Sequence, residues 1–338
     1  MEPIKSPRAF ASAKQVAERA GVSRSAVSRA FTPGASISED MRRRVLLASE
    51  ELGYHVNHLA RGLLRSSGIV CLIVADSDTP YQARLVRALV EHLQNAGRVS
   101  MILAVPRQLE SIEHTLRQTL NYRADATIVL SGTPPQAIIR TCLDSGQRMI
   151  LINRDDHLTG PYHIDLDNVA AARTALHAFR RAGCRRLAVV TSEAGTASLR
   201  AREAAFSTLA SEHGLDVGVS RKGRTSYESG AEGARVLLAG GMRPDGVFCT
   251  TDLIACGFID AARHEFRLHV PEQLCVIGFD DIEQAGWGSY RLTTFAPPID
   301  RLAARVVELV TVGGESSRDA VRTTFEADFV WRNTVRPG

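Results

Sequence analysis

Four polar residues near the start of the chain have types and spacing that suit contacts with nucleic acid. They are Arg24, Ser25, Ser28 and Arg29. A helix over this segment would carry these side chains at its polar start. Their guanidinium and hydroxyl groups could then donate hydrogen bonds to guanine edges or to phosphates in a major groove. The chemistry predicted for this segment is therefore hydrogen bonding to double-stranded DNA.

Capping residues predict that this helix is the second of two short helices joined by a tight turn. Ser12 followed three residues later by Gln15 forms a capping box, which satisfies free N–H groups at the start of a first helix. That helix is expected to stop at Gly21, and Ser23 can cap the next one. The turn between them has the spacing of a helix-turn-helix, so Ser12, Gln15 and Ser23 join the residues expected at the DNA surface.

A third helix is expected from Ser38 to just before Gly53, because acidic residues follow its first position and suit a helix N-terminus. Three of its apolar residues are expected to close a small core, namely Val45, Leu46 and Leu52. Its early turns carry three arginines, namely Arg42, Arg43 and Arg44. These arginines either form an ordinary solvated face or approach phosphates, which would position the domain without reading sequence.

Basic charge is concentrated in this first segment. Residues 1–65 hold 11 Lys or Arg against 6 Asp or Glu, whereas the rest of the 338 residues hold 30 against 31. A basic excess beside a helix-turn-helix pattern favours a polyanion over a membrane as the partner, because no long apolar span or amphipathic basic helix accompanies it. The first residues also lack the apolar stretch of a secretory signal, so a cytoplasmic protein is expected.

The six cysteines are dispersed in mostly apolar surroundings, and no two of them form a Cys-x-x-Cys pair. This distribution predicts buried, reduced thiols rather than disulfides or zinc ligands. We therefore expect neither a metal site nor a cofactor.

The remainder of the chain alternates short apolar runs with amphipathic stretches, which is the pattern of parallel sheets covered by helices. Strands are expected near residues 69–75, 100–104, 126–130, 149–152, 186–190, 246–249, 274–278 and 325–331. Helices are expected near residues 85–96, 112–121, 137–144, 168–182, 200–213, 230–239, 254–265 and 301–312. The two series predict two doubly wound lobes, whose ligand would lie beyond the carboxyl ends of the strands in a cleft between the lobes.

Two other classes of protein would share parts of this pattern. An enzyme would be expected to carry a phosphate-binding or nucleophile motif, but the sequence has no G-x-G-x-x-G after a first strand, no G-x-x-x-x-G-K-S/T and no G-x-S-x-G. His264 and His269 are five residues apart and miss the common helix face that a zinc-binding H-E-x-x-H needs. A transport-associated solute-binding protein would have the same two lobes, but it would need an export signal and no helix-turn-helix.

An ordered series of segments resembles the lac repressor and purine repressor family of bacterial transcription regulators. The matching segments are Val16-Ala17, Ala20-Gly21-Val22-Ser23, Val27-Ser28-Arg29, Glu51-Leu52-Gly53-Tyr54, residues 57–64, Val276-Ile277-Gly278-Phe279-Asp280-Asp281 and Leu292-Thr293-Thr294. One tetrapeptide could match by chance, whereas an ordered series along nearly the whole chain is specific.

The resemblance implies that two segments contact DNA. Arg24, Ser25 and Arg29 occupy the family's base-reading positions. Residues 57–64 resemble the family's hinge helix, and five residues there are expected at the DNA surface, namely Asn57, His58, Ala60, Arg61 and Leu63. Leu63 is either a wedge between base pairs in the minor groove, which would bend the DNA at the centre of a symmetric site, or merely the end of a linker.

The resemblance also implies ligand contacts in the cleft. The matching positions are Asp76, Tyr81, Gln82, Ser131, Asn153, Arg202, Asp252 and Asp280. Arg202 is favoured as an anchor because its planar cationic fork suits carboxylate, phosphate or hydroxyl oxygens. Asp280 could accept two sugar hydroxyls or serve only as a turn residue. The chain departs from the family pattern at Asn153, where many relatives carry aspartate, and at Thr225, where several carry an aromatic platform. Two other aromatic residues could supply a stacking face or serve a core or interface, namely Trp287 and Tyr290.

Together these features predict an α/β protein with an all-α helix-turn-helix domain and a two-lobed, periplasmic-binding-protein-like effector domain with doubly wound parallel sheets. The expected bounds are 1–56 for the first domain, 57–65 for the hinge and 66–338 for the effector-binding and dimerisation domain. Its first lobe is expected at about 66–160 and 292–320, and its second at about 161–291 and 321–338. The predicted function is that of a transcription regulator, usually a repressor, and not of an enzyme.

Three partners are predicted for such a regulator. They are a pseudo-palindromic double-stranded DNA operator, a small polar effector, for which a sugar or sugar acid is favoured, and a second copy of the chain. A homodimer is preferred over a tetramer because no long heptad tail follows the body of the sequence. No membrane partner is expected.

Overall fold

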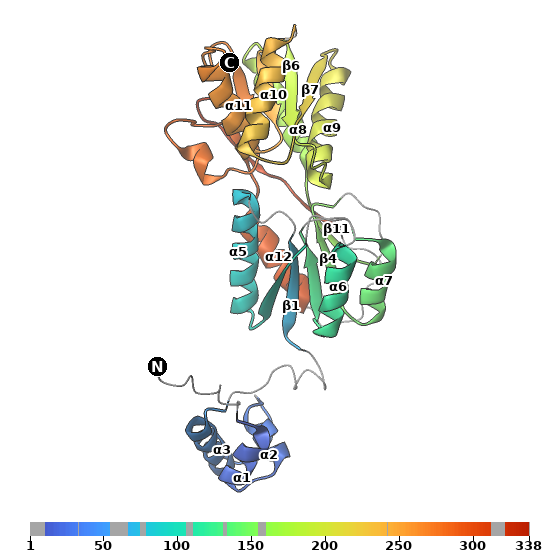
Figure 1. Ribbon diagram of the computed structural model, residues 1–338, viewed down its shortest axis with the longest axis vertical. Coiled ribbons are helices and arrows are strands. Elements are labelled where there is room, and N and C mark those ends of the chain that lie inside the picture. The colour runs from blue at the N-terminus through green and yellow to red at the C-terminus, as the bar shows by residue number, and fades with distance from the viewer. Residues whose placement is uncertain are drawn as a thin grey trace, which may run out of the picture. The chain divides into compact units, whose positions relative to one another are not determined.

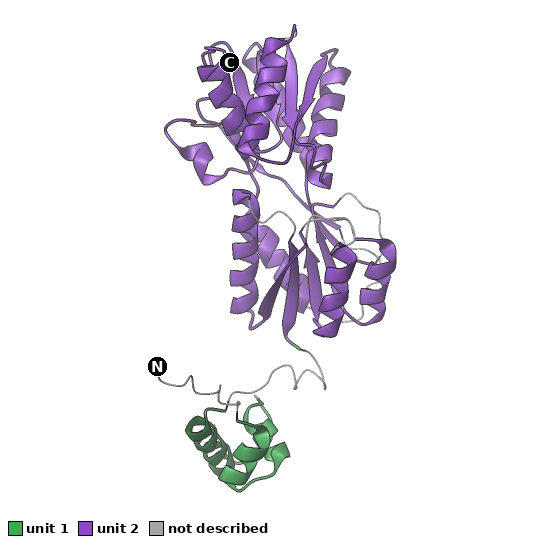
Figure 2. Cartoon of the chain, viewed as in Figure 1, with its two compact units in different colours: residues 1–67 green, residues 68–338 purple. Residues whose placement is uncertain are grey.

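The computed structural model describes most of the chain in two compact units, residues 1–67 and 68–338 (Figure 2). The described residues are 11–32, 34–54, 67–74, 79–105, 111–130, 134–154, 160–241, 243–311 and 322–337. Several residues expected to bind DNA or effector lie outside these ranges, namely Asn57, His58, Ala60, Arg61, Leu63, Asp76 and Ser131.

The first unit contains the three expected helices. They are α1 (Ala13–Ala20), α2 (Arg24–Ala30) and α3 (Glu39–Leu52). The capping box is present, because the Ser12 hydroxyl accepts from the Gln15 backbone N–H at 3.3 Å and the Gln15 side chain accepts from the Ser12 N–H at 2.8 Å. Ser23 caps α2 and Ser38 caps α3. Gly21 ends α1 with a φ of 64°, a left-handed conformation that glycine adopts without steric cost.

The core of the first unit differs in part from the expectation. Val16, Val27 and Val45 are fully or almost fully buried where the three helices meet. Leu46, in contrast, is 45 % exposed, and Leu52 is also exposed. Consecutive helix positions are about 100° apart, so burial of Val45 turns Leu46 away from the core.

The first lobe of the second unit is a six-stranded parallel sheet with helices on both faces (Figure 1). In the order β11-β5-β4-β3-β1-β2 its strands are Arg322–Phe325, Tyr162–Leu166, Arg148–Ile152, Ala126–Val129, Ile69–Val74 and Val99–Ala104. The helices are α5 (Pro80–Asn95), α6 (Ser111–Asn121), α7 (Gln136–Asp144) and α12 (Ile299–Thr311). Adjacent strand residues face opposite sides, so Leu72 packs with α5 and α12, whereas Ile73 packs with α6 and α7.

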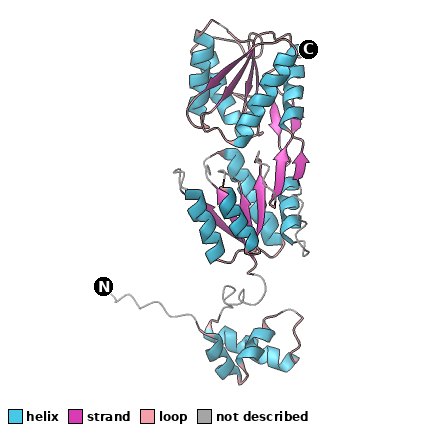
Figure 3. Cartoon of the chain, turned by 90° about the vertical axis from the view of Figure 1, so that its right-hand side faces the viewer, coloured by secondary structure: helices cyan, strands magenta, loops and turns pink. Residues whose placement is uncertain are grey.

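The second lobe repeats this architecture on four parallel strands, and Figure 3 shows the strands of both lobes flanked by helices. In the order β7-β6-β8-β9 the strands are Val217–Arg221, Leu187–Thr191, Gly246–Cys249 and Cys275–Ile277. The helices are α8 (Asn168–Arg181), α9 (Ala197–Glu212), α10 (Tyr227–Ala239) and α11 (Asp252–His264). Val189 faces α8 and α9, and Val190 faces α10 and α11. A short 3-10 helix, η1 (Glu283–Gly286), follows β9.

The boundary between the lobes corrects the expected division at residues 160 and 320. Both β5 and β11 belong to the first-lobe sheet, because His163 pairs with Leu151 of β4 on one side and with Arg322 of β11 on the other. The chain also crosses between the lobes at β10 (Thr294–Ala296) and β12 (Asp328–Val330), which form an antiparallel pair with Phe295 opposite Phe329. These cross-connections join the two lobes in one unit.

Candidate nucleic-acid interface and ligand cavity

The four polar residues of α2 share an exposed helix face. Arg24, Ser25, Ser28 and Arg29 are exposed, while the helix buries its opposite face, which consists of Ala26, Val27 and Ala30. The Arg29 Nε donates to the Ser25 carbonyl at 3.4 Å, which leaves the rest of its guanidinium available. The face therefore has the donors and the exposure that a helix needs to enter a DNA groove.

The arginines of α3 have different roles. Arg42 donates to the Ala30 carbonyl at 2.7 Å and to the Ala35 carbonyl at 3.4 Å. It therefore stabilises the connection between α2 and α3, a role that neither of the expected alternatives included. Arg43 and Arg44 are exposed and pair with Asp40 at 2.9 and 3.3 Å.

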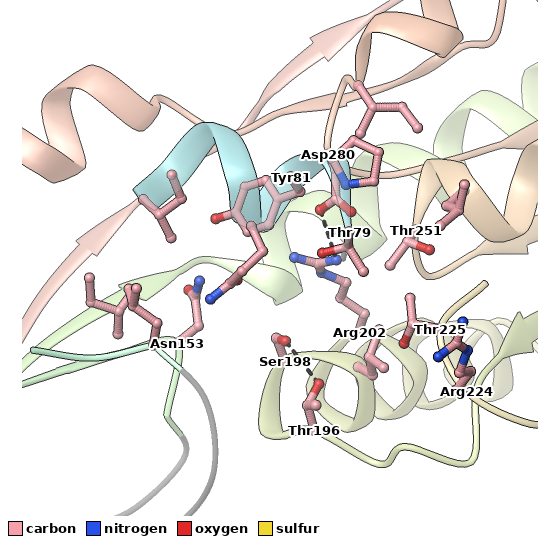
Figure 4. Close-up of a pocket in the computed structure, with 18 of the residues that line it drawn as sticks. Thr79, Tyr81, Asn153, Thr196, Ser198, Arg202, Arg224, Thr225, Thr251 and Asp280 are labelled. Atoms are coloured by element: carbon pink, nitrogen blue, oxygen red, sulfur yellow. Dashed lines mark hydrogen bonds and ion pairs between the residues drawn. The ribbon is translucent and has the colours of Figure 1, made fainter. Parts of the chain in front are cut away.

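A cavity of about 190 Å³ lies between the two lobes of the second unit (Figure 4). Its first-lobe wall is formed by the start of α5 and the ends of β3 and β4, and its second-lobe wall by the loops after β6, β7, β8 and β9. Its position beyond the carboxyl ends of parallel strands is the one that the sequence predicts. Five of the residues expected to contact an effector line it, namely Tyr81, Gln82, Asn153, Arg202 and Asp280.

Four helices begin at the cavity wall with a threonine or serine at the N-cap. Ser226 and Thr251 cap α10 and α11 by accepting from the Ser229 and Ile254 N–H groups at 3.2 and 3.4 Å. Thr79 and Thr196, at the starts of α5 and α9, make no capping hydrogen bond with their side chains. Neither of these two threonine side chains therefore caps its helix, and the partial positive charge of four helix ends is directed at one cavity.

Arg202 is the most enclosed cation of the cavity wall. It is 3 % exposed, and its guanidinium lies 3.5 Å from the centre of the Phe279 ring. Its Nη1 donates to the Thr250 carbonyl at 2.7 Å and to Asp280 Oδ1 at 3.3 Å, and its Nε donates to Asn168 Oδ1 at 3.3 Å. Because an arginine has five N–H donors, this arrangement fixes the guanidinium plane and leaves Nη2 to bind a ligand.

Asp280 is held in an unusual state by its surroundings. Its φ of 114° lies in a region that residues with side chains rarely adopt. Burial raises the pKa of its carboxyl to about 7, although Arg202 opposes this shift by favouring the charged form. A strained backbone and a strongly shifted carboxyl at a cavity wall are features of functional sites.

The first-lobe wall contributes neutral polar groups. The Tyr81 hydroxyl is buried near the Asn153 side chain without a well-formed hydrogen bond to any described residue, and burial raises its pKa to about 12. Asn153 adopts a φ of 53° at the end of β4, while its backbone N–H donates to the Ile164 carbonyl at 2.8 Å. A buried hydroxyl without a partner is costly unless a ligand or water satisfies it.

Asp252 does not line the cavity, which corrects its expected role in effector contact. Its side chain is fully buried at the start of α11 and accepts from the Ile282 N–H at 3.0 Å and from the Thr294 hydroxyl at 2.5 Å. Gly278 is required beside it, because a Cβ there would lie 2.1 Å from Asp252 Oδ1. Asp252 therefore connects α11 to the segments that follow β9 and thereby helps to position Asp280.

Asp252 should make the free energy of unfolding depend on pH. Burial raises its pKa from 3.8 to about 8, so between these values the folded state holds the proton more tightly than the unfolded state. The stability that this group contributes is greatest below pH 4 and is lost as the pH rises towards 8. Between pH 5 and 7 the wild-type protein should lose about 3 kcal/mol of unfolding free energy relative to Asp252→Asn. Urea unfolding of both proteins measures this difference, and a constant difference would mean that Asp252 is already ionised at pH 5.

Several cavity residues were not expected from the sequence. They include Thr79, Arg154, Thr196, Ser198, Arg224, Ser226 and Thr251. Most of them lie where a strand-end loop meets the start of a helix, so an N-cap pattern after each strand could have indicated them. The two aromatic residues considered as stacking faces do not line the cavity: Trp287 is 49 % exposed, and the Tyr290 hydroxyl donates to Asp260 at 2.7 Å.

The described residues lack two further kinds of feature. They contain no group of His, Cys, Asp or Glu side chains arranged to hold a metal ion. Within the same residues, no helix combines the length and the apolar composition that crossing a membrane requires.

Comparison with known proteins identifies the family. Residues 12–57 match the model of bacterial regulatory proteins of the lacI family, and residues 176–335 match the periplasmic binding protein-like domain. The transcriptional regulator GalS of Salmonella typhimurium is 30% identical over 328 residues, which cover 95% of this chain and 96% of that protein. The transcriptional repressor PurR of Pasteurella multocida is 25% identical over 337 residues, which cover 97% and 99%.

A solved structure also matches the fold over nearly the whole chain. A crystal structure of the lac repressor dimer bound to operator and the anti-inducer ONPF matches with a TM-score of 0.86 at 20% identity, over 96% of this chain and 99% of that one. The expected fold class and family are thus confirmed, and the relatives named are regulators of transcription rather than enzymes. The chain belongs to the lacI family of bacterial regulatory proteins, which are DNA-binding regulators of transcription.

Proposed function

We propose that the protein is a repressor that binds a pseudo-palindromic operator as a homodimer and changes its affinity for DNA when a small polar metabolite enters the cavity. A sugar or a sugar acid is the favoured metabolite. A homodimer matches two half-sites by its two-fold symmetry. Since its partner is the bacterial chromosome, the protein would act in the cytoplasm.

The observation that carries this proposal is the pairing of Arg202 and Asp280 inside the cavity. Their 3.3 Å contact fixes one cationic and one anionic group at the same wall, with the Nη2 of Arg202 still available. Such a pair can donate to one oxygen of a polyol and accept from the next. Tyr81 on the opposite lobe adds a buried hydroxyl that no described residue satisfies with a well-formed hydrogen bond, so a polar ligand would complete both walls.

Closure of the lobes around this ligand would be the regulatory step. The ligand would contact α5 in the first lobe and α9 in the second, so its binding favours one relative orientation of the lobes. If the metabolite changes operator affinity, the operator must change metabolite affinity by the same factor, typically equivalent to about 1 to 3 kcal/mol.

Selection of bound duplexes from a random pool tests the proposal. The winning duplex is then titrated by fluorescence anisotropy at two salt concentrations, with and without metabolites. A palindromic consensus, a steep salt dependence and a shift of affinity by one metabolite are expected. Failure to enrich any sequence, both alone and with a metabolite pool present, would contradict the proposal.

Arg29→Ala should weaken binding to the selected operator by about 1 to 3 kcal/mol, because one bidentate contact to a guanine has this value. Preference should relax at one base pair of each half-site. Binding to random duplex should change much less, and Arg180→Ala, on the exposed last turn of α8, should leave both affinities unchanged. An equal loss on operator and random DNA would assign Arg29 to phosphate instead.

A further inference from the structure

The second-lobe wall of the cavity contains a cation that has no partner among the described residues. Arg224 is exposed in the loop between β7 and α10 and lines the cavity, and no carboxylate or carbonyl of the described residues contacts its guanidinium (Figure 4). Three arginines that do not line the cavity are paired with carboxylates: Arg221 with Glu203, Arg235 with Glu228 and Glu265, and Arg332 with Asp281. Arg224 differs from them by facing the ligand space without a counter-charge.

The start of α9 adds a second source of positive potential to the same wall. Its first backbone hydrogen bond runs from the Arg200 N–H to the Thr196 carbonyl, and the hydroxyl of Thr196 bonds to that of Ser198 rather than capping the helix. The N–H groups of the first turn are thus available to an acceptor in the cavity, and the helix dipole favours negative charge there.

Negative charge on this wall is small. Asp280 is the one acidic residue among the described residues that line the cavity, and it is already paired with Arg202. Burial raises its pKa to about 7, so part of its charge is lost near neutral pH. A neutral ligand would leave Arg224 and the first turn of α9 without an anionic partner.

We propose that the metabolite is an anion whose carboxylate or phosphate group binds Arg224 at the second-lobe wall. This inference rests on the proposed function, because it names the chemical class of the same effector. The ligand's hydroxyls would then face Arg202, Asp280 and the first lobe, while its charged group lies at the mouth of the cavity. Both charged groups suit the guanidinium fork, and the experiment separates them.

Thermal unfolding of the full chain in the presence of defined anions tests the inference. The probes are sodium sulfate and inorganic phosphate against sodium chloride at matched ionic strength, followed by gluconate and glucose 6-phosphate against glucose. Sulfate and phosphate stabilise many proteins non-specifically, so the readout is the difference between wild type and Arg224→Gln. Arg180→Gln is the matched control, since Arg180 is an exposed arginine of the same lobe that does not line the cavity.

Wild type and Arg180→Gln should gain the same increase in Tm from sulfate or phosphate, and Arg224→Gln should gain less than half of it. The affinity for gluconate or for glucose 6-phosphate, whichever binds more tightly, should fall about tenfold or more in Arg224→Gln, the value of one charge-assisted contact. That preference identifies carboxylate or phosphate as the group bound.

Equal shifts in Arg224→Gln and wild type, or no shift beyond chloride, would overturn the inference. Stabilisation by glucose as strong as that by its two anionic relatives would do the same. Operator titrations keep the two proposals apart. If a neutral metabolite alters operator binding, the proposed function stands and the proposal of an anionic effector is wrong. If no operator can be found, the proposed function is refuted, while the changes in Tm caused by anions still show whether the cavity binds them.

Discussion

Replacement of Arg202 by methionine should destabilise the second unit by about 3 to 5 kcal/mol at pH 8 and abolish the response to the metabolite. Methionine retains an apolar stem beside Phe279 but leaves Asp280 as a buried carboxylate without its partner. The loss should be smaller at pH 6, because the pKa of Asp280 is already about 7 and would rise further without the arginine, so the carboxyl can become neutral. Urea unfolding at the two pH values measures this dependence.

The double variant Arg202→Met/Asp280→Asn separates stability from ligand binding. It removes both charges, so no unpaired carboxylate remains, and most of the lost stability should return. The metabolite response should stay absent, because the guanidinium donors are still missing. Operator affinity without metabolite should match that of wild type in the double variant. A full metabolite response in either variant would place the effector elsewhere in the protein.

The helix-turn-helix could be predicted from the sequence because its signals are local. The capping pair Ser12 and Gln15 lies within one helical turn, and the alternation of buried Val27 with exposed Ser28 and Arg29 follows from helix geometry. The role of Arg42 could not be predicted from such local signals. Its partners are the carbonyls of Ala30 and Ala35, twelve and seven residues away, and no side-chain pattern indicates which carbonyls a folded loop exposes.

The lobe boundary could not be predicted because it depends on pairing between distant strands. The β5 strand contains His163 and Asp165, so its sequence lacks the apolar run of a buried strand. Its place in the first sheet follows from hydrogen bonds to β4 and to β11, and β11 begins about 160 residues further along the chain. Sequence periodicity carries no information about such long-range partners.

The position of the candidate site could be predicted from the sequence, but several of the residues that line it could not. An acidic residue after a strand can point into the cleft, as Asp280 does, or into the protein, as Asp252 does. The two differ in which neighbouring N–H and hydroxyl groups lie within reach, which only the folded loops decide. Arg224 could not be identified from the sequence, because an isolated arginine in a polar loop looks like an ordinary surface residue.

Gly257→Ala should lower the free energy of unfolding by at least about 3 kcal/mol, the upper range for overpacking. Gly257 lies in α11 where this helix crosses α10, and an added Cβ would lie 1.8 Å from the Tyr227 carbonyl oxygen. Gly230 of α10 has the reciprocal position, 2.0 Å from the Ile254 carbonyl. Alanine in a helix interior is otherwise favoured over glycine by about 1 kcal/mol, so the sign of the change reports the contact between the backbones.

The same variant should weaken the metabolite response, since the α10–α11 crossing positions two hydroxyls of the cavity wall. Ser226 begins α10 and Thr251 begins α11, and both line the cavity. Moving the helices apart to accept a methyl group displaces these N-caps relative to Arg202, and small displacements in a binding site are costly. Gly286→Ala is the matched control, because an added Cβ there meets no atom within 4 Å, and its stability should be unchanged. Equal stability of Gly257→Ala and wild type in urea unfolding would mean that the two helices can separate without cost, and their close crossing would then not be what holds the second-lobe wall in place.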